Sequence, residues 1–339
     1  MADRSLRTRR VAGIDIGSNS VRLMVADATL QEDGSISIEV VDERTEVTRL
    51  SEGVDHRGIL LPAPITRTRS ALTSYRQAAL AHGCTFVLAT ATSAVRDADN
   101  GEAFLGEVEY SFGFRTQLLS GSEEAELSWR GMRSDPGLDA RVRTGSWGLV
   151  DIGGGSTEVL VARDGELVDS HSFQLGCVRL TERHLAETDP PAAAAIATTR
   201  AAVREQLQDR FPAPATLDGM VGVAGTVTTM AARTLGLATY DPDLVHRSEV
   251  SARAVHAELG AAAALPLEQR RELPGMEPRR APVILAGYCI LAEVLDHFGL
   301  AGLAASETDI LNGIAWEAGR IAHAEDLREL PQPHGRTSC

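Results

Sequence analysis

Apolar runs alternate along the chain with longer stretches in which apolar residues recur at helical spacing. The runs at 11–14, 86–90 and 147–150 are typical of buried strands, and the stretch 62–81, followed by Gly83, is typical of a helix. Strands and helices in alternation predict an α/β fold.

One pattern of thirteen residues occurs twice. Residues 15–27 (DIGSNSVRLMVAD) and 151–163 (DIGGGSTEVLVAR) are identical at six positions without a gap. Each copy follows an apolar run and precedes alternating apolar residues, which is typical of strand, Gly/Ser turn and strand in a β-hairpin. We therefore expect one fold used twice, as two similar domains that flank a cleft and each open with a hairpin.

The rest of the pattern sets the domain limits. A polar, turn-rich segment at 131–145 separates the two halves. We predict a first domain at 1–130, completed by a C-terminal helix at 306–324, and a second domain at 131–305. Residues 325–339 contain two prolines and a glycine and are predicted to form a flexible tail.

Charge and composition exclude several classes of protein. The 339 residues include 47 acidic and 33 basic side chains, giving a formal net charge of −14, and every basic residue is arginine. Without lysine there is no Walker-type P-loop, and the negative charge argues against binding of duplex nucleic acid. No apolar run is long enough to span a bilayer and no leader precedes the first strand, so we expect a soluble, cytoplasmic protein with no membrane partner. An anionic substrate would need local arginines, backbone amides or a metal ion.

The two Gly/Ser turns are the strongest candidates for chemistry. Glycine lets a ligand approach the backbone closely, and successive N–H groups together with hydroxyls bind phosphate. A plain hairpin turn is the alternative, but two copies, each preceded by an acidic residue, favour phosphate loops. The predicted phosphate-binding residues are Gly17, Ser18, Asn19 and Ser20 in the first copy and Gly153, Gly154, Gly155, Ser156 and Thr157 in the second.

Acidic residues accompany both turns. Asp15 and Asp151 end apolar strands, and hard oxygen ligands beside a phosphate suit Mg²⁺; the alternative is a bond from each carboxylate to its own turn amides. Glu158 occupies in the second copy the position that Arg22 has in the first, which predicts an acid from one hairpin and a base from the other across the cleft. Asp15 and Asp151 are thus predicted metal ligands, and Arg22 is a predicted substrate ligand.

Further candidates lie where predicted strands give way to helices. Glu124 follows a Ser-Gly-Ser cluster and can either support the helix N-terminus or orient water for attack on phosphorus. Arg96 can bind phosphate, or it can form an ion pair with a neighbouring aspartate. Gly225 and Thr226 lie in a third strand-to-helix turn, where anion or nucleotide binding and plain packing are both open.

Five motifs, taken in order, resemble the exopolyphosphatase/guanosine pentaphosphate phosphohydrolase (Ppx/GppA) family of the actin-like superfamily. They are DIGSNSVRL, ATSAVRDA, SGSEEAELSWRG, DIGGGSTEV and GVAGTVTT. The resemblance implies two actin-like (ribonuclease H-like) α/β domains around a cleft, dependence on Mg²⁺ and hydrolysis of terminal phosphoanhydrides. It places the family's catalytic carboxylate on Glu124 and its phosphate-facing arginine on Arg96. The family's other acidic residues, which bind metal or activate water, fall on Asp151 and Glu158, so the predicted metal ligands are Asp15, Asp151 and Glu158.

This resemblance predicts an exopolyphosphatase that releases the terminal phosphate of inorganic polyphosphate, with water oriented by Glu124 and with Glu158 nearby. The alternative substrate is guanosine pentaphosphate (pppGpp), which a short and acidic chain favours. An actin-like ATPase or sugar kinase, or a non-catalytic sensor of either anion, is a further alternative. A homodimer is also expected from the resemblance, and oxygen ligands suit Mn²⁺ as well as Mg²⁺.

Overall fold

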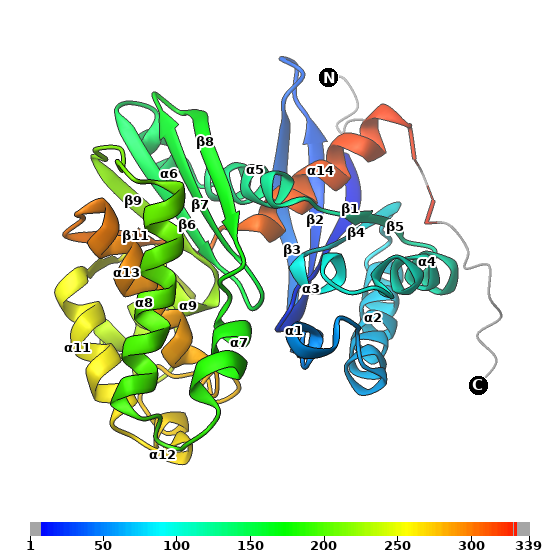
Figure 1. Cartoon of the computed structure of the whole chain (residues 1–339). Coiled ribbons are helices and arrows are strands. Elements are labelled where there is room, and N and C mark those ends of the chain that lie inside the picture. The colour runs from blue at the N-terminus through cyan, green and yellow to red at the C-terminus, as the bar shows by residue number, and fades with distance from the viewer. Residues whose placement is uncertain (1–7, 328, 331–339) are drawn as a thin grey trace. The chain divides into compact units, whose positions relative to one another are not determined.

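The computed structural model describes residues 8–327, 329 and 330, which form two compact units (Figure 1). Unit 1 consists of the chain up to Ser134 together with the chain from Asp309, and unit 2 is Asp135–Thr308. The first boundary lies inside the turn-rich segment 131–145, although part of that segment is helical (α6, Pro136–Val142).

Unit 1 is built on a five-stranded sheet in the order β3-β2-β1-β4-β5. Strands β1, β2 and β3 are antiparallel, and β4 and β5 run parallel to β1. The strands are β1 (Thr8–Ile16), β2 (Ser20–Leu30), β3 (Ile36–Val47), β4 (Phe86–Ala91) and β5 (Arg115–Leu118). Because β4 is buried over its whole length, it has the continuous apolar run that the sequence shows.

Helices cover both faces of this sheet. One face packs on α2 and α4 through residues such as Leu72 and Phe104, and the other packs on α14 through residues such as Ile314. The helices of unit 1 are α1 (Val54–Arg57), α2 (Pro62–Ala81), α3 (Ser93–Arg96), α4 (Gly101–Phe112), α5 (Gly121–Met132) and α14 (Ile310–Ala324). The C-terminal helix, expected at 306–324, begins at Ile310 and belongs to unit 1.

Unit 2 repeats the plan with a six-stranded sheet in the order β10-β11-β9-β6-β7-β8. Strands β6, β7 and β8 are antiparallel, β9 and β11 run parallel in the β6 direction, and β10 is an antiparallel edge strand. The strands are β6 (Ser146–Ile152), β7 (Thr157–Arg163), β8 (Glu166–Phe173), β9 (Gly219–Val223), β10 (Glu249–Ser251) and β11 (Gly302–Ala305). The remaining helices are α7 (Cys177–Leu180), α8 (Ala193–Arg210), α9 (Ala224–Thr234), α10 (Pro242–Val245), α11 (Ala252–Ala263), α12 (Leu267–Arg271) and α13 (Ile284–Phe298), with a π-helical turn at Thr181–Leu185.

The strand registers confirm the hairpin repeat and the α/β fold. In the first hairpin Asp15 lies opposite Arg22, and in the second Asp151 lies opposite Glu158. These are equivalent positions of the two thirteen-residue copies, so the repeated sequence forms the same local structure in both units.

Two glycines let α5 and α14 cross in close contact within unit 1. A Cβ atom on Gly131 would lie 1.7 Å from the carbonyl oxygen of Asp309, and one on Gly313 would lie 2.2 Å from that of Leu127. Only residues without a Cβ fit this approach. The crossing places the end of α5, where the chain leaves unit 1, beside Asp309, where the chain returns.

The predicted flexible tail falls partly on residues 328 and 331–339, which lie outside the described residues. At its described start, Glu325 accepts two hydrogen bonds from Arg115, at 2.6 and 2.9 Å, and Asp326 forms an ion pair with Arg9. These contacts hold the first residues of the segment on unit 1. In the described part of the chain, no helix combines the length and the apolar character needed to cross a membrane.

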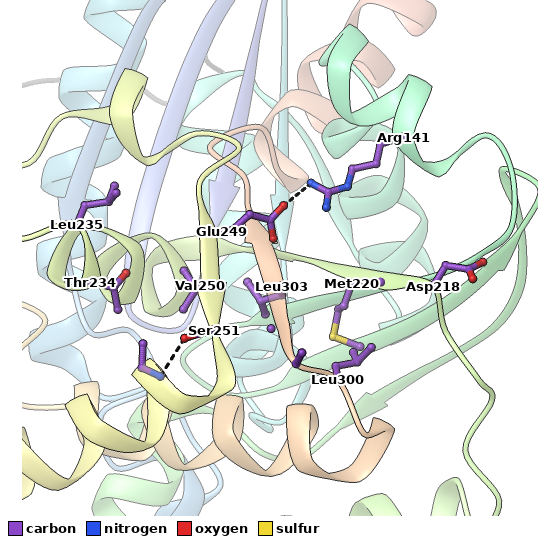
Figure 2. Close-up of a pocket in the computed structure, with 14 residues that line it drawn as sticks. Arg141, Asp218, Met220, Thr234, Leu235, Glu249, Val250, Ser251, Leu300 and Leu303 are labelled. Atoms are coloured by element: carbon purple, nitrogen blue, oxygen red, sulfur yellow. Dashed lines mark hydrogen bonds and ion pairs between the residues drawn. The ribbon is translucent and has the colours of Figure 1, made fainter.

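A cavity of about 510 Å³ lies in unit 2, at the amino-terminal ends of β9 and β11 (Figure 2). Apolar side chains such as Met220 and Leu303 line it, and Arg141 and Glu249 form an ion pair of 2.6 Å among its lining residues. None of the residues singled out in the sequence lines this cavity. It therefore lies at the sheet edge opposite to the one that the predicted site residues follow.

The α5–α14 crossing makes a prediction about stability. Gly131→Ala should lower the free energy of unfolding by about 1–3 kcal/mol, because the added methyl group overlaps the Asp309 carbonyl. Gly106→Ala is the matched control: Gly106 lies inside α4 with open space around it, so alanine should raise the stability by roughly 0.5–1 kcal/mol. Urea denaturation of the full chain measures both, and equal stability of the Gly131→Ala variant and the wild type would contradict the close crossing.

Candidate active site

The predicted site residues of unit 1 lie at one edge of its sheet. The final residues of β1, β4 and β5 are in register with one another. Because parallel strands present their carboxyl ends at the same edge, the turns that follow these strands lie together there. These turns contain Gly17–Ser20, Arg96 and the start of the helix that carries Glu124.

The first Gly/Ser turn presents backbone amides. The Gly17 N–H donates to the carbonyl of Ser20 at 3.0 Å, and the carbonyls of Ser18 and Asn19 accept from amides in the segment 48–51. The amides of Ser18 and Asn19 donate to no other group in the residues that the structure describes. Since the carbonyls are held by the protein, these amides are the groups left to bind an anion.

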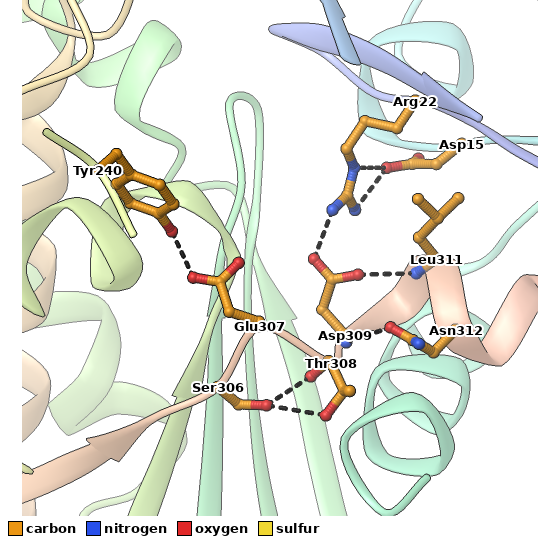
Figure 3. Close-up of polar contacts among 9 residues, drawn as sticks. All are labelled: Asp15, Arg22, Tyr240, Ser306, Glu307, Thr308, Asp309, Leu311 and Asn312. Atoms are coloured by element: carbon orange, nitrogen blue, oxygen red, sulfur yellow. Dashed lines mark hydrogen bonds and ion pairs between the residues drawn. The ribbon is translucent and has the colours of Figure 1, made fainter. Parts of the chain in front are cut away.

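An ion-pair cluster lies directly beside this turn (Figure 3). Arg22 donates from Nε and Nη2 to Asp15 Oδ2, at 3.1 and 2.9 Å, and from Nη1 to Asp309 Oδ2 at 2.5 Å. Burial alone would lower the pKa of Arg22, but the charges of Asp309 and Asp15 raise it, so the guanidinium stays charged. The Oδ1 atom of Asp15 is buried with no hydrogen-bond partner in the described part of the chain, which leaves it able to face a cation.

Glu124 and Arg96 meet at the same edge. Glu124 lies in the first turn of α5 and is 5% exposed. Arg96 donates from Nη1 both to Glu124 Oε1 and to the carbonyl of Leu119, the latter at 2.7 Å. Arg96 therefore holds the carboxylate of Glu124 in place.

The neighbouring Glu123 has a different role. Its carboxylate accepts from the Ser120 N–H at 2.7 Å, and the Ser120 hydroxyl accepts from the Glu123 N–H at 3.3 Å. This capping box fixes the start of α5 and points Glu123 outward while Glu124 is buried. The two adjacent glutamates of the sequence are thus distinguished by the geometry of the helix start.

The Gly-rich turn of unit 2 is closed in the same way as its counterpart. The Gly153 N–H donates to the carbonyl of Ser156 at 3.0 Å, and the carbonyls of Gly153–Gly155 accept from the segment 177–179. Among the described residues, the amides of Gly154 and Gly155 have no acceptor. This turn also leaves two successive N–H groups for an anion.

Beside this turn the ion pair of unit 1 is replaced by two acids. Asp151 and Glu158 are neighbours across β6 and β7 and are 6% and 3% exposed; Ser172 donates its hydroxyl to Glu158 at 2.6 Å. Two adjacent buried carboxylates favour a bound cation. No group of three or more His, Cys, Asp or Glu side chains suited to a metal occurs in the described residues. The pair fits Mg²⁺, which typically takes one or two carboxylates and completes its shell with water and phosphate oxygens.

Two predicted substrate residues turn their side chains into the core. The Thr157 hydroxyl donates to the carbonyl of Leu175, and Thr157 is 1% exposed. Thr226 is 3% exposed and packs against Gly287, where a Cβ would lie 2.6 Å from its methyl carbon. The Thr157 hydroxyl is therefore engaged within the protein, where the sequence predicted a contact with phosphate. For Thr226 the side chain takes the packing alternative that the sequence left open.

Arg280 is a site residue that the sequence reasoning missed. Its guanidinium covers Gly225, where a Cβ would lie 1.7 Å from Nη1, and its Nε donates to Glu277 at 2.8 Å. A cation at the N-terminus of α9 opposes the helix dipole, so it suits a place where an anion binds. Arg280 lies far along the chain from the Gly225 turn and outside any strand–turn motif, which is why pattern reasoning does not find it.

Comparison with known proteins agrees with this architecture. The Ppx/GppA phosphatase family profile matches residues 29–318. Exopolyphosphatase 2 of Mycobacterium tuberculosis is 37% identical over 322 residues, covering 90% of this chain and 97% of the relative.

Solved structures give the same result. A Ppx/GppA family member from Aquifex aeolicus has a TM-score of 0.75 at 29% identity, and an exopolyphosphatase-like protein has a TM-score of 0.85 at 30% identity; each alignment covers 94% of this chain and 99% of the other. With two hairpin-led mixed sheets and a profile match over most of its length, the chain belongs to the Ppx/GppA phosphatase family.

Proposed function

We propose that this chain is an exopolyphosphatase, a hydrolase that removes the terminal phosphate of inorganic polyphosphate. The observation that carries the proposal is the placement of Glu124, a buried carboxylate that Arg96 fixes at one sheet edge. At the same edge, the Ser18 and Asn19 amides have no acceptor among the residues that the structure describes. Support for polyphosphate as the substrate comes from the relative named exopolyphosphatase 2.

In this mechanism unit 1 supplies the general base. Glu124 accepts a proton from the attacking water as the water oxygen bonds to the terminal phosphorus. The bridging P–O bond breaks, and its electron pair leaves with the shortened chain, so one water and one phosphoanhydride give orthophosphate and a polymer shorter by one unit. The amides of Ser18 and Asn19 would stabilise the charge that develops on the phosphoryl oxygens.

Unit 2 has candidate phosphate contacts and a candidate cation site of its own. The amides of Gly154 and Gly155 suit phosphate oxygens, and Asp151 and Glu158 would hold Mg²⁺ or Mn²⁺. Such a cation, when bound, neutralises substrate charge and polarises the phosphoryl group. Arg280 at the N-terminus of α9 offers a further place for an anionic group.

Hydrolysis of pppGpp to ppGpp is the second candidate function. The observation that favours it is Tyr240, a residue that is 39% exposed and whose hydroxyl donates to Glu307 (Figure 3). Thr228 of α9 hydrogen-bonds to the Tyr240 hydroxyl, so that hydroxyl lies beside the first half of the helix. An exposed aromatic ring there can stack on a guanine base, which a linear polyphosphate lacks.

The catalytic assignment is tested by comparing two adjacent glutamates. Glu124→Gln should lower the rate of phosphate release from polyphosphate by about 10²–10⁴-fold, because an amide cannot accept the proton. Glu123→Gln is the control, since glutamine retains the capping box and should leave the rate close to that of wild type. Phosphate release at saturating polyphosphate measures both. A Glu124→Gln enzyme with wild-type turnover would overturn the assignment.

The cation site makes a second prediction. EDTA should abolish phosphate release, and Mg²⁺ or Mn²⁺ should restore it. Asp151→Asn and Glu158→Gln should each raise the Mg²⁺ concentration for half-maximal rate by at least about tenfold, whereas Glu166→Gln, an exposed change on β8, should not. Full activity in EDTA would contradict the role of the acid pair.

A further inference from the structure

Asp309 holds a fixed position beside the candidate phosphate turn of unit 1 (Figure 3). It is 4% exposed, its Oδ1 accepts from the Leu311 N–H at 2.9 Å, and the Asn312 side chain accepts from the Asp309 N–H at 3.0 Å. These bonds cap α14 and leave Oδ2 directed at Arg22. The Asp309 carboxylate thus caps α14 with Oδ1 and pairs with the Arg22 guanidinium through Oδ2.

The ion pair between Asp309 and Arg22 is not needed for capping α14 or for balancing the charge of Arg22. Arg22 is already balanced by Asp15, which takes two of its nitrogen donors. An aspartate in the N-cap position needs only one oxygen for capping, and asparagine serves equally well there. Asp309 therefore adds a negative charge that neither capping nor charge balance explains.

The local charge around the turn is consequently negative. Asp15 and Asp309 place two acids around one base, Arg22. Glu43 on β3 lies near the same ion pairs. The pKa of Glu43 is raised by burial and then by the charge of Asp309, and Arg22 lowers it by a smaller amount. A negative field beside a phosphate site weakens the binding of a polyanion.

We propose that Asp309 lowers the affinity of the unit 1 phosphate turn for polyanionic substrate by occupying Arg22 Nη1, the nitrogen that Asp15 leaves, and by adding a second negative charge beside it. Without Asp309, Nη1 would be able to donate a charge-assisted hydrogen bond to a phosphate oxygen. With Arg22 held, the turn binds through backbone amides, and the ground-state affinity for substrate is kept low. The inference rests on the proposed function and adds a specificity-determining residue to it.

Asp309→Asn tests this inference because it retains the cap and removes the charge. The KM for polyphosphate should fall by about tenfold without a rise in kcat, and it should depend more steeply on salt concentration. Glu39→Gln is the matched control, since it removes one negative charge from an exposed position of β3 and should leave KM unchanged. In the double variant Arg22→Gln/Asp309→Asn the gain in affinity should disappear.

Calorimetry measures the affinity of the same variants for inorganic tripolyphosphate, independently of their turnover. Tighter binding in Asp309→Asn that is lost in the double variant supports the inference. Unchanged binding and KM in a folded Asp309→Asn protein would overturn it, and so would a gain that survives loss of Arg22. A wild-type enzyme that binds tripolyphosphate but releases no phosphate from polyphosphate would instead contradict the proposed function alone.

Discussion

The site depends on the common register of parallel strands. In unit 1, β1, β4 and β5 end side by side, and in unit 2, β6, β9 and β11 do the same. This register brings Arg96, which follows β4, into contact with Glu124, which follows β5. Slippage of one strand by a residue would turn its side chains to the opposite face and dismantle the edge.

A second constraint is how a chain of net charge −14 without lysine handles phosphate. Three arginines near the candidate turns are paired with acids: Arg22 with Asp15 and Asp309, Arg96 with Glu124, and Arg280 with Glu277. The positive charge of these three side chains is therefore compensated within the protein. In the proposed mechanism phosphate contact falls to backbone amides, which carry no net charge and are fixed in direction because neighbouring segments hold the carbonyls.

Local and repeated features could be predicted from the sequence, and side-chain partners across the fold could not. The hairpins, their Gly/Ser turns and the α/β alternation follow from periodicity and turn residues, which act over a few positions. The start of α5 follows from its capping residues. By contrast, the contact of Asp309 with Arg22 joins positions 287 residues apart, and that of Arg280 with Gly225 depends on how a distant segment packs. The inward turn of Thr157 and Thr226 also depends on packing, since a hydroxyl in a glycine-rich turn looks the same in the sequence whichever way it faces.

The most direct test of the central claim is product analysis with polyphosphate of defined length. If Glu124 directs water to the terminal phosphorus, orthophosphate appears from the first turnover, and the polymer shortens by one unit at a time. The account predicts this result in the presence of Mg²⁺, with no acceptor molecule required. Fragments from internal cleavage, transfer of phosphate to a sugar or nucleotide, or phosphate release from pppGpp but not from polyphosphate would contradict it.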